Sequence, residues 1–497
     1  MADATAPRPP REQRFERRMS DAEALMWNVE KDPWLNPSGG SLILLDRPPD
    51  VEHFTAQLAA TVADVPRLRE RVVPGLGRFS PPVWRPDPEF DLGFHIRRVA
   101  LAPPGDERAL LDLVAALYQD PYDRTRPLWM FYVVEGLGGG GAALIWKIHH
   151  TVADGTGAGR LAEAFLQPTD DPPEPRPVDL DAVVSAAAEL DGGGGEGTGA
   201  LIGSVRDTVT HAARRQAGIV RRAMSEVAMW GADPLRARDA VGGVVGAVRQ
   251  VGGQLSRPGR GGGTDDEGIP GGSPLWRSRS RHRRLELLSF PLDEALGAAK
   301  ALGGSLNDWF VTGVVNGAVR YHDARGVPLR TLNTSFVVST RNDRAIGGNS
   351  FSPTRFSAPA GPMAPGERFA LLSAAMREKR EGVSGGGALA GFAGVANLLP
   401  TSLVTSVARS QAAGMDFATS NLRGAKVQLY ISGAAVTGNH PFGPLAGTAF
   451  NLTAMSYNGR LDMGLFVDPI AVQDPSELRD DLDAAYRELD DIAARPT

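Results

Sequence analysis

The chain has 497 residues, with 53 lysines and arginines against 58 aspartates and glutamates, and a formal net charge of −5 at pH 7. That length exceeds one ordinary hydrophobic core and predicts two large domains, while the negative charge argues against a general nucleic-acid binder, which needs a basic surface. The sequence contains no cysteine, which excludes disulfides, thiolate nucleophiles and cysteine-ligated zinc or iron–sulfur centres and is compatible with the reducing cytosol.

The N-terminal third is predicted to contain a disordered tail followed by one lobe. Residues 1–18 begin with prolines and charges that no apolar run follows, so they do not look like a secretory signal and are expected to be disordered. Residues 19–167 alternate helical and strand patterns and form the expected N-terminal lobe. Its expected elements are a helix at 21–27, a strand at 41–45, a helix at 51–63, strands at 128–134 and 142–146, and a helix at 157–166.

The most informative motif, His149-His150-Thr151-Val152-Ala153-Asp154-Gly155, follows the second strand of a predicted hairpin whose turn is glycine-rich. Histidine is readily neutral near physiological pH, so the motif offers a candidate general base. Asp154 is expected to fold back and hold the loop, and Gly155 leaves the backbone open to close approach. The run is interpreted as an active-site loop, and the alternative is an ordinary loop whose polar residues satisfy one another.

Residues 168–283 are predicted to form a flexible, partly helical connector, because they hold prolines at 168–177 and glycine runs at 192–195 and 259–263. The helix-prone stretch 201–260 has ten arginines against four acidic residues. Two hypotheses stay open for it: an amphipathic helix on anionic lipid, or a solvated link between domains. The basic cluster at 277–284 could attract phosphates, although such charge runs are usually solvated.

Residues 284–497 return to a mixed pattern and form the expected C-terminal lobe of an α/β fold with mixed sheets. Ser305 is the expected N-cap of a helix whose first turn holds Asn307 and Asp308, where acidic side chains are favoured and capping alone also explains them. The expected elements are strands at 284–290, 334–341, 427–433, 449–457 and 461–467, and helices at 292–302, 305–315 and 475–492.

The longest uncharged, largely apolar stretch runs from residue 382 to residue 408. Pro400 and several polar residues interrupt it, which argues against a transmembrane span. Two short apolar helices are expected instead, packed in the core or resting on a bilayer surface.

Several of these residues match a known family in chain order. The sequence resembles the bacterial wax ester synthase/diacylglycerol acyltransferase family, within the superfamily of chloramphenicol acetyltransferase. The resemblance implies two chloramphenicol acetyltransferase-like lobes with flanking helices and an active site in a tunnel at the lobe interface. The chain lacks the valine-proline-glycine-proline turn that the family commonly carries after the position of Asn421. The matching residues include Pro127-Leu128-Trp129, His149 to Gly155, Leu306-Asn307-Asp308 and Ser456 to Leu461.

The resemblance implies transfer of a long-chain acyl group from acyl-CoA to diacylglycerol, to a long-chain alcohol, or to both. In that reaction His150 is the expected general base, His149 shapes the turn or lines the channel, and Asp154 holds the loop. Asn307 is the expected contributor to oxyanion stabilisation or to the tautomer of His150. The expected substrate-binding residues are Pro127, Leu128, Trp129, Gly155 and Asp308. No metal and no cofactor are expected, since acyl-CoA is a co-substrate.

Two alternatives remain at the level of sequence. One is a condensation-type acyltransferase that takes its acyl group from a carrier protein, and the other is a catalytically idle lipid-binding protein. For the leading hypothesis we expect a cytoplasmic protein that lies peripherally on the inner face of the membrane or on lipid inclusions, with contact to a lipid-droplet surface and none to nucleic acid.

Overall fold

The structure is a computed structural model, and it describes part of the chain. The described residues are 17–75, 81–153, 161–191, 272–339, 351–382 and 401–494. Within these ranges, the side chains of residues 336–339, 351–355 and 380–382 are not described.

The first of two large sheets contains the predicted hairpin at its centre. Its six strands run in the order β11, β12, β1, β6, β5, β4, and all neighbours are antiparallel except β4 and β5. β1 is therefore covered on both edges, by β6 on one side and β12 on the other. The strands are β1 (Ser38–Leu45), β4 (Ile96–Ala100), β5 (Trp129–Glu135), β6 (Ala142–His149), β11 (Tyr430–Ile431) and β12 (Ala434–Phe442).

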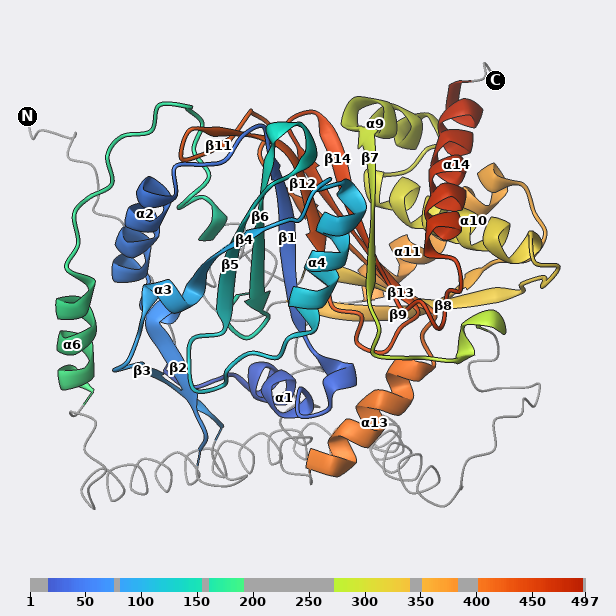
Figure 1. The fold of residues 1–497 in the computed structure, drawn as a ribbon. Coiled ribbons are helices and arrows are strands. Elements are labelled where there is room, and N and C mark those ends of the chain that lie inside the picture. Colours follow the sequence, from blue (N-terminus) through green and yellow to red (C-terminus); the bar gives the residue numbers. More distant parts are fainter. Residues whose placement is uncertain are drawn as a thin grey trace, which may run out of the picture.

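Helices cover both faces of this sheet, with α2 on one face and α4 on the other (Figure 1). The alternation along β6 explains this, since Leu144 and Trp146 pack with Phe54 of α2, whereas Ile145 packs with Val114 of α4. Besides α2 and α4, this region holds shorter helices and the two short strands β2 and β3. The elements are α1 (Asp21–Val29), η1 (Pro33–Leu35), α2 (Val51–Asp64), η2 (Pro66–Arg69), β2 (Glu70–Val73), β3 (Val83–Pro86), α3 (Leu92–His95), α4 (Glu107–Gln119), η3 (Gly138–Gly140) and α6 (Leu180–Leu190).

The second sheet runs in the order β7, β14, β13, β10, β8, β9, and β10 is parallel to both of its neighbours. Four of the described helices cover its outer face around Trp309 and Tyr486. The elements are η4 (Leu275–Arg277), β7 (Arg284–Pro291), α9 (Leu292–Ala301), α10 (Leu306–Asp323), β8 (Thr331–Ser339), β9 (Phe351–Pro359), α11 (Pro365–Gly382), α13 (Thr401–Ala413), β10 (Phe417–Arg423), β13 (Phe450–Tyr457), β14 (Arg460–Val467) and α14 (Pro475–Ala494).

β12 is hydrogen-bonded as a strand of the first sheet only, but it also packs against β13 and β14 of the second sheet; we call it the shared strand because both sheets contact it. The backbone N–H of Asn439 on β12 donates to Asp462 on β14 at 2.9 Å, and the rings of Phe442 and Phe466 stack between the sheets. β11 and β12 lie within the range 284–497 that was expected to form the C-terminal lobe, yet they belong to the first sheet. The two lobes are thus not two consecutive stretches of chain.

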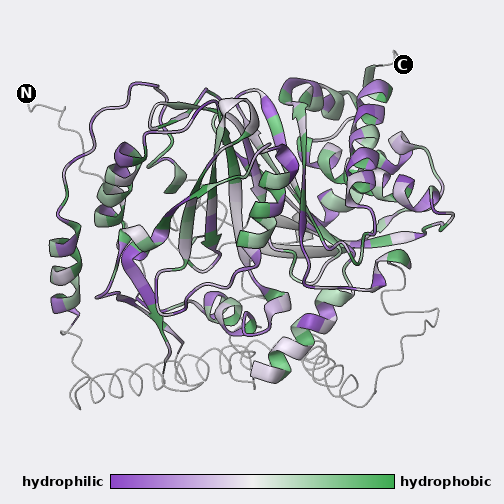
Figure 2. Cartoon of the chain, viewed as in Figure 1, coloured by the Kyte–Doolittle hydropathy of each residue, from purple (hydrophilic) through white to green (hydrophobic). Residues whose placement is uncertain are grey.

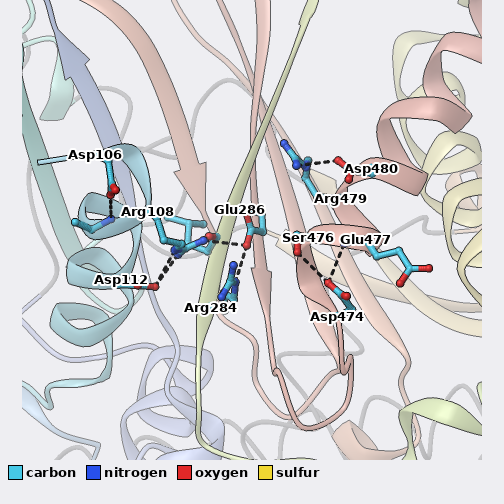
Figure 3. Close-up of polar contacts among 12 residues, drawn as sticks. Asp106, Arg108, Asp112, Arg284, Glu286, Asp474, Ser476, Glu477, Arg479 and Asp480 are labelled. Carbon is cyan, nitrogen blue, oxygen red and sulfur yellow. Dashed lines mark hydrogen bonds and ion pairs between the residues drawn. The ribbon is translucent and has the colours of Figure 1, made fainter. Parts of the chain in front are cut away.

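A polar contact joins the lobes on the same side as α4. Arg108 of α4 donates to the carboxylate of Glu286 on β7 at 2.9 Å and to the carbonyl of Leu285 at 3.1 Å, while Arg284 donates to the same carboxylate at 2.6 Å (Figure 3). Only 7% of Glu286 is exposed. We call Arg108, Arg284 and Glu286 the lobe clasp.

The structure confirms the α/β class and most expected elements. The Ser305 cap forms, and the β13–β14 hairpin turns at Asn458 and Gly459, both with positive φ. The strand expected at 427–433 is wrong, because only Tyr430 and Ile431 pair; Ser432 and Gly433 then adopt positive φ and turn the chain into β12. β12 has no counterpart among the expected elements, and neither have α4, α11, β4, β9 and β10.

Several expectations fall wholly or partly outside the described residues. These include the tail up to residue 16, most of the arginine-rich connector, and the apolar segment up to residue 400. The helix expected at 157–166 is described only from residue 161, where residues 161 and 162 alone are helical. Within the described ranges, none of the helices is both long enough and apolar enough to cross a membrane.

Candidate active site

The motif of residues 149–155 begins at the end of β6, a strand whose eight residues are all buried and which is strongly hydrophobic (Figure 2). His149 is its last residue and pairs across the sheet with Ser38 of β1. Its backbone N–H donates to the carbonyl of Leu128 at 3.0 Å, and its carbonyl accepts the N–H of Val152 at 2.9 Å. The position of His149 is therefore fixed by backbone bonds on both sides.

The imidazole of His149 is fully buried, with 0% of the residue exposed. Its Nδ1 accepts the backbone N–H of Thr151 at 3.1 Å, and the Thr151 hydroxyl lies 2.6 Å from the same atom. Because an N–H donates to Nδ1, the neutral ring carries its proton on Nε2. Nε2 lies 3.3 Å from a carboxylate oxygen of Glu30. His149 thus bonds to both Thr151 and Val152 within the turn, and its two expected roles stay predictions.

His150 is the first residue beyond β6 and is only half-buried. Its Nε2 faces the backbone of Gly39 on β1, since a Cβ built on Gly39 would lie 3.6 Å from that atom and 3.2 Å from the carbonyl of Phe442. The ring therefore lies where β1 meets the shared strand β12. The two histidines differ in exposure, because His149 is fully buried and His150 is only half-buried.

Asp154 and Gly155, the other polar and glycine positions of the motif, lie outside the described residues. Their expected roles stay predictions.

The residues Pro127, Leu128 and Trp129 are buried at the start of β5. The indole of Trp129 donates to the carbonyl of Leu68 at 2.8 Å, and the imidazole of His95 stacks on it at 4.2 Å. Together with the bond from His149 to Leu128, these contacts favour a role in positioning the hairpin over the substrate contact expected from the sequence. The sequence does not indicate that His95 packs against Trp129, because a lone histidine carries no signal of its contacts.

Asn307 and Asp308 begin α10. Asp308 completes a capping box, accepting from the Ser305 N–H at 2.8 Å, and the amide of Asn307 lies 4.0 Å from the sulfur of Met376. α10 packs on the face of the second sheet that points away from the first lobe (Figure 1). These contacts favour capping and packing over the oxyanion and substrate roles that the resemblance implied.

A second polar side chain interrupts the apolar strand β6. The ammonium group of Lys147 donates to the carbonyl of Leu117 at 2.9 Å and to that of Asp120, at the C-terminal end of α4. These carbonyls have no partner within the helix, and a cation is favoured at this end of the helix dipole. Burial lowers the pKa of Lys147 to about 8. Among the described side chains, no group of three or more His, Asp or Glu is arranged to hold a metal ion.

Comparison with known proteins gives the chain its family. Residues 19–310 match the model of the wax ester synthase/diacylglycerol acyltransferase catalytic domain, and residues 347–490 match that of the C-terminal domain of the same family. A putative diacylglycerol O-acyltransferase from Mycobacterium tuberculosis strain H37Rv is 31% identical over 493 residues, which cover 96% of this chain and 94% of the relative. Another from the same strain is 29% identical and covers 86% of each chain.

Solved structures share the two-lobed fold. The wax ester synthase/diacylglycerol acyltransferase from Marinobacter aquaeolei VT8 aligns with a TM-score of 0.61 at 21% identity, over 96% of this chain and 100% of that one. The first condensation domain of the calcium-dependent antibiotic synthetase aligns with a TM-score of 0.52 at 17% identity, over 96% of each chain. The chain belongs to the wax ester synthase/diacylglycerol acyltransferase family.

Proposed function

We propose that this protein transfers a long-chain acyl group from acyl-CoA to the hydroxyl of diacylglycerol, of a long-chain alcohol, or of both, with His150 as the general base. The observation that carries the proposal is the difference in burial and bonding between the two histidines. His149 is locked by backbone and side-chain bonds, whereas the next residue, His150, is half-buried at the junction of β1 and β12. The family match and the similarity to diacylglycerol O-acyltransferases support the substrate class.

The chemistry needs a base because an alcohol is a poor nucleophile near neutral pH. The neutral imidazole of His150 takes the hydroxyl proton while the alcohol oxygen attacks the thioester carbonyl carbon. The tetrahedral intermediate then expels CoA as a thiolate, which recovers the proton from the imidazolium. The acyl group passes directly between the substrates, and a base of this kind is typically worth about 10² to 10⁴ in rate.

The rest of the motif supports this step. We place Asp154 and Gly155 in the loop that follows, with Asp154 holding the loop and Gly155 open to a substrate. The substrates would meet in a tunnel between the lobes, as the family resemblance implies, where Gly39 presents bare backbone to the ring of His150. We assign Pro127, Leu128 and Trp129 to positioning of the hairpin, and Asn307 and Asp308 to the start of α10.

We also propose that the protein works at a lipid surface, on the inner face of the membrane or on lipid inclusions, because both kinds of acceptor are lipids. The purified protein should float with liposomes that contain diolein. A protein that stays at the bottom of the gradient would contradict this part of the proposal.

The test of function uses release of free CoA from palmitoyl-CoA in the presence of diolein or hexadecanol. Because the chain contains no cysteine, a thiol reagent reports CoA alone. We expect His150→Ala to lower turnover by about 10² to 10⁴ and to leave the thermal midpoint nearly unchanged. His53→Ala, at a histidine of α2 that is half-buried like His150, is the matched control and should keep full activity. Folded protein that releases no CoA with either acceptor, or an active His150→Ala variant, would refute the proposal.

Two other functions are weaker. A condensation-type enzyme with a carrier-protein donor shares the fold, but both matching family models are of the acyltransferase family. An idle lipid-binding protein has no need for the buried bonds that hold His149 beside His150.

A further inference from the structure

We propose that Glu30 is a positioning residue for the acyl transfer: it holds the Nε2–H tautomer of His149 and thereby fixes the turn that presents His150. The inference rests on the proposed function of His150. Nothing in the sequence motif points to Glu30, which follows α1 and is far from the histidines along the chain.

The contact between the two side chains is buried. Glu30 is the C-cap of α1, and its backbone N–H donates to the carbonyl of Met26, so the end of the helix sets the place of the carboxylate. One carboxylate oxygen lies 3.3 Å from Nε2 of His149 and 3.6 Å from a guanidinium nitrogen of Arg124. The guanidinium of Arg124 in turn lies 3.4 Å above the ring of Trp27.

The surroundings keep Glu30 ionised. Burial by itself raises the pKa of Glu30, but the contact with His149 and the positive charges of Arg124 and Lys147 outweigh it, and the pKa lies below its usual value. The hydroxyl of Thr151 lies beside the ring of His149, and the rings of Tyr122 and Trp27 are arranged edge to face with it at centroid distances of 6.1 and 6.4 Å. In this enclosed place a carboxylate is the natural acceptor for the Nε2 proton.

The tautomer matters at the other side of the ring. With the proton on Nε2, Nδ1 can accept the backbone N–H of Thr151, and the chain turns directly after His150. With the proton on Nδ1 instead, two donors would face each other, and the N–H of Thr151 would be buried without an acceptor. Glu30 thus acts on His150 through His149 and Thr151. Arrangements of this kind, in which a carboxylate holds a histidine in one tautomer, are known to orient catalytic groups.

The experiment compares three substitutions of Glu30. Glu30→Gln keeps the reach and an acceptor oxygen but loses the charge, Glu30→Asp keeps the charge but loses the reach, and Glu30→Ala loses both. We expect kcat to fall by about 10²-fold in Glu30→Ala and Glu30→Asp, the size of effect that a small misplacement of a catalytic group produces. KM for acyl-CoA should not change. Glu30→Gln should retain most of the activity.

A second measurement reads the tautomer without any substrate. Protein labelled with ¹⁵N-histidine gives distinct nitrogen shifts for protonated and unprotonated ring nitrogens, and the signals of His149 are assigned by their loss in His149→Asn. We expect Nε2–H in the unaltered protein and in Glu30→Gln, and a mixture of tautomers in Glu30→Ala and Glu30→Asp. Glu23→Ala is the matched control in the same helix: it breaks the Ser20 capping box and weakens α1, but should leave both tautomer and kcat unchanged.

Three results would overturn the inference. The first is full activity in Glu30→Ala. The second is an active Glu30→Asp together with an inactive Glu30→Gln, because that pattern would mean that the charge alone matters. The third is a loss of kcat in a variant whose His149 keeps the Nε2–H tautomer. The failure of the proposed function is a separate result, since it would appear as absence of turnover in the unaltered protein, whatever the tautomer of His149.

Discussion

The lobe clasp allows a prediction whose size follows from its geometry. Arg108 makes two bonds across the lobes, to Glu286 at 2.9 Å and to the carbonyl of Leu285 at 3.1 Å, and a third within its own helix, to Asp112 at 2.9 Å. A hydrogen bond to a charged group contributes about 1.5 to 3 kcal/mol when it is well buried. The side chain of Arg108 is 31% exposed, and Arg284 keeps Glu286 paired when Arg108 is removed. We therefore expect a coupling free energy of about 1 kcal/mol between Arg108 and Glu286.

The assay is a double-mutant cycle with Arg108→Ala and Glu286→Ala, measured by urea unfolding at equilibrium with tryptophan fluorescence. Asp112 supplies an internal control. It pairs with the same arginine, but it lies four residues further along the same helix and its side chain is 62% exposed. For that pair we expect a coupling of about 0.3 to 0.5 kcal/mol, as for exposed helix pairs. Equal couplings for the two pairs, or none between Arg108 and Glu286, would refute the argument that this contact holds the lobes together.

Two further predictions concern stability. Burial lowers the pKa of His95 to about 4, so between pH 6.5 and pH 4 the unfolded chain binds a proton that the folded chain does not. The free energy of unfolding should therefore fall by up to about 3 kcal/mol as the pH drops through this window. His95→Phe should flatten that part of the stability profile, and parallel profiles for the two proteins would contradict the prediction. Gly313→Ala should destabilise by about 1 to 3 kcal/mol, because its Cβ would lie 2.0 Å from the ring of Tyr486. Gly297→Ala, in open space on α9, should instead stabilise the protein in the same thermal melt, and shifts of the same sign for both would refute the packing argument.

The sequence predicts those features of this molecule that depend on local pattern. The hairpin of β5 and β6 is encoded by two apolar runs around a glycine turn, and Ser305 begins α10 because its hydroxyl caps the helix. The different settings of the two histidines also have a local cause, since His149 still belongs to a buried strand and His150 does not.

Some missed features, such as β12, depend on pairing between distant parts of the chain, whereas the missed helix α4 has a local signal, since Asp106 caps it and one of its faces is apolar. β12 holds Asn439, His440 and Pro441, a polar run with little strand character, and it is a strand because it fills the edge of β1. The bond that joins Ser41 to Asn439 spans 398 residues. The contact of Glu30 with His149 is likewise tertiary. Lys147 is a local exception in the apolar strand β6 that also has a tertiary explanation, because its ammonium group donates to a carbonyl at the C-terminal end of α4.

The shared strand has a consequence for the order in which the protein is made. β1 and β6 leave the ribosome early, but the second edge of β1 is covered only by Ala434–Phe442, far along the chain. Until then the nascent protein exposes a row of unpaired backbone groups beside Gly39, the kind of edge on which other chains add strands. His150, the proposed base, and the strand β12 beside it meet only near the end of synthesis. A chain cut short before residue 434 would therefore carry both histidines without an assembled site, and would need protection from aggregation rather than restraint of its activity.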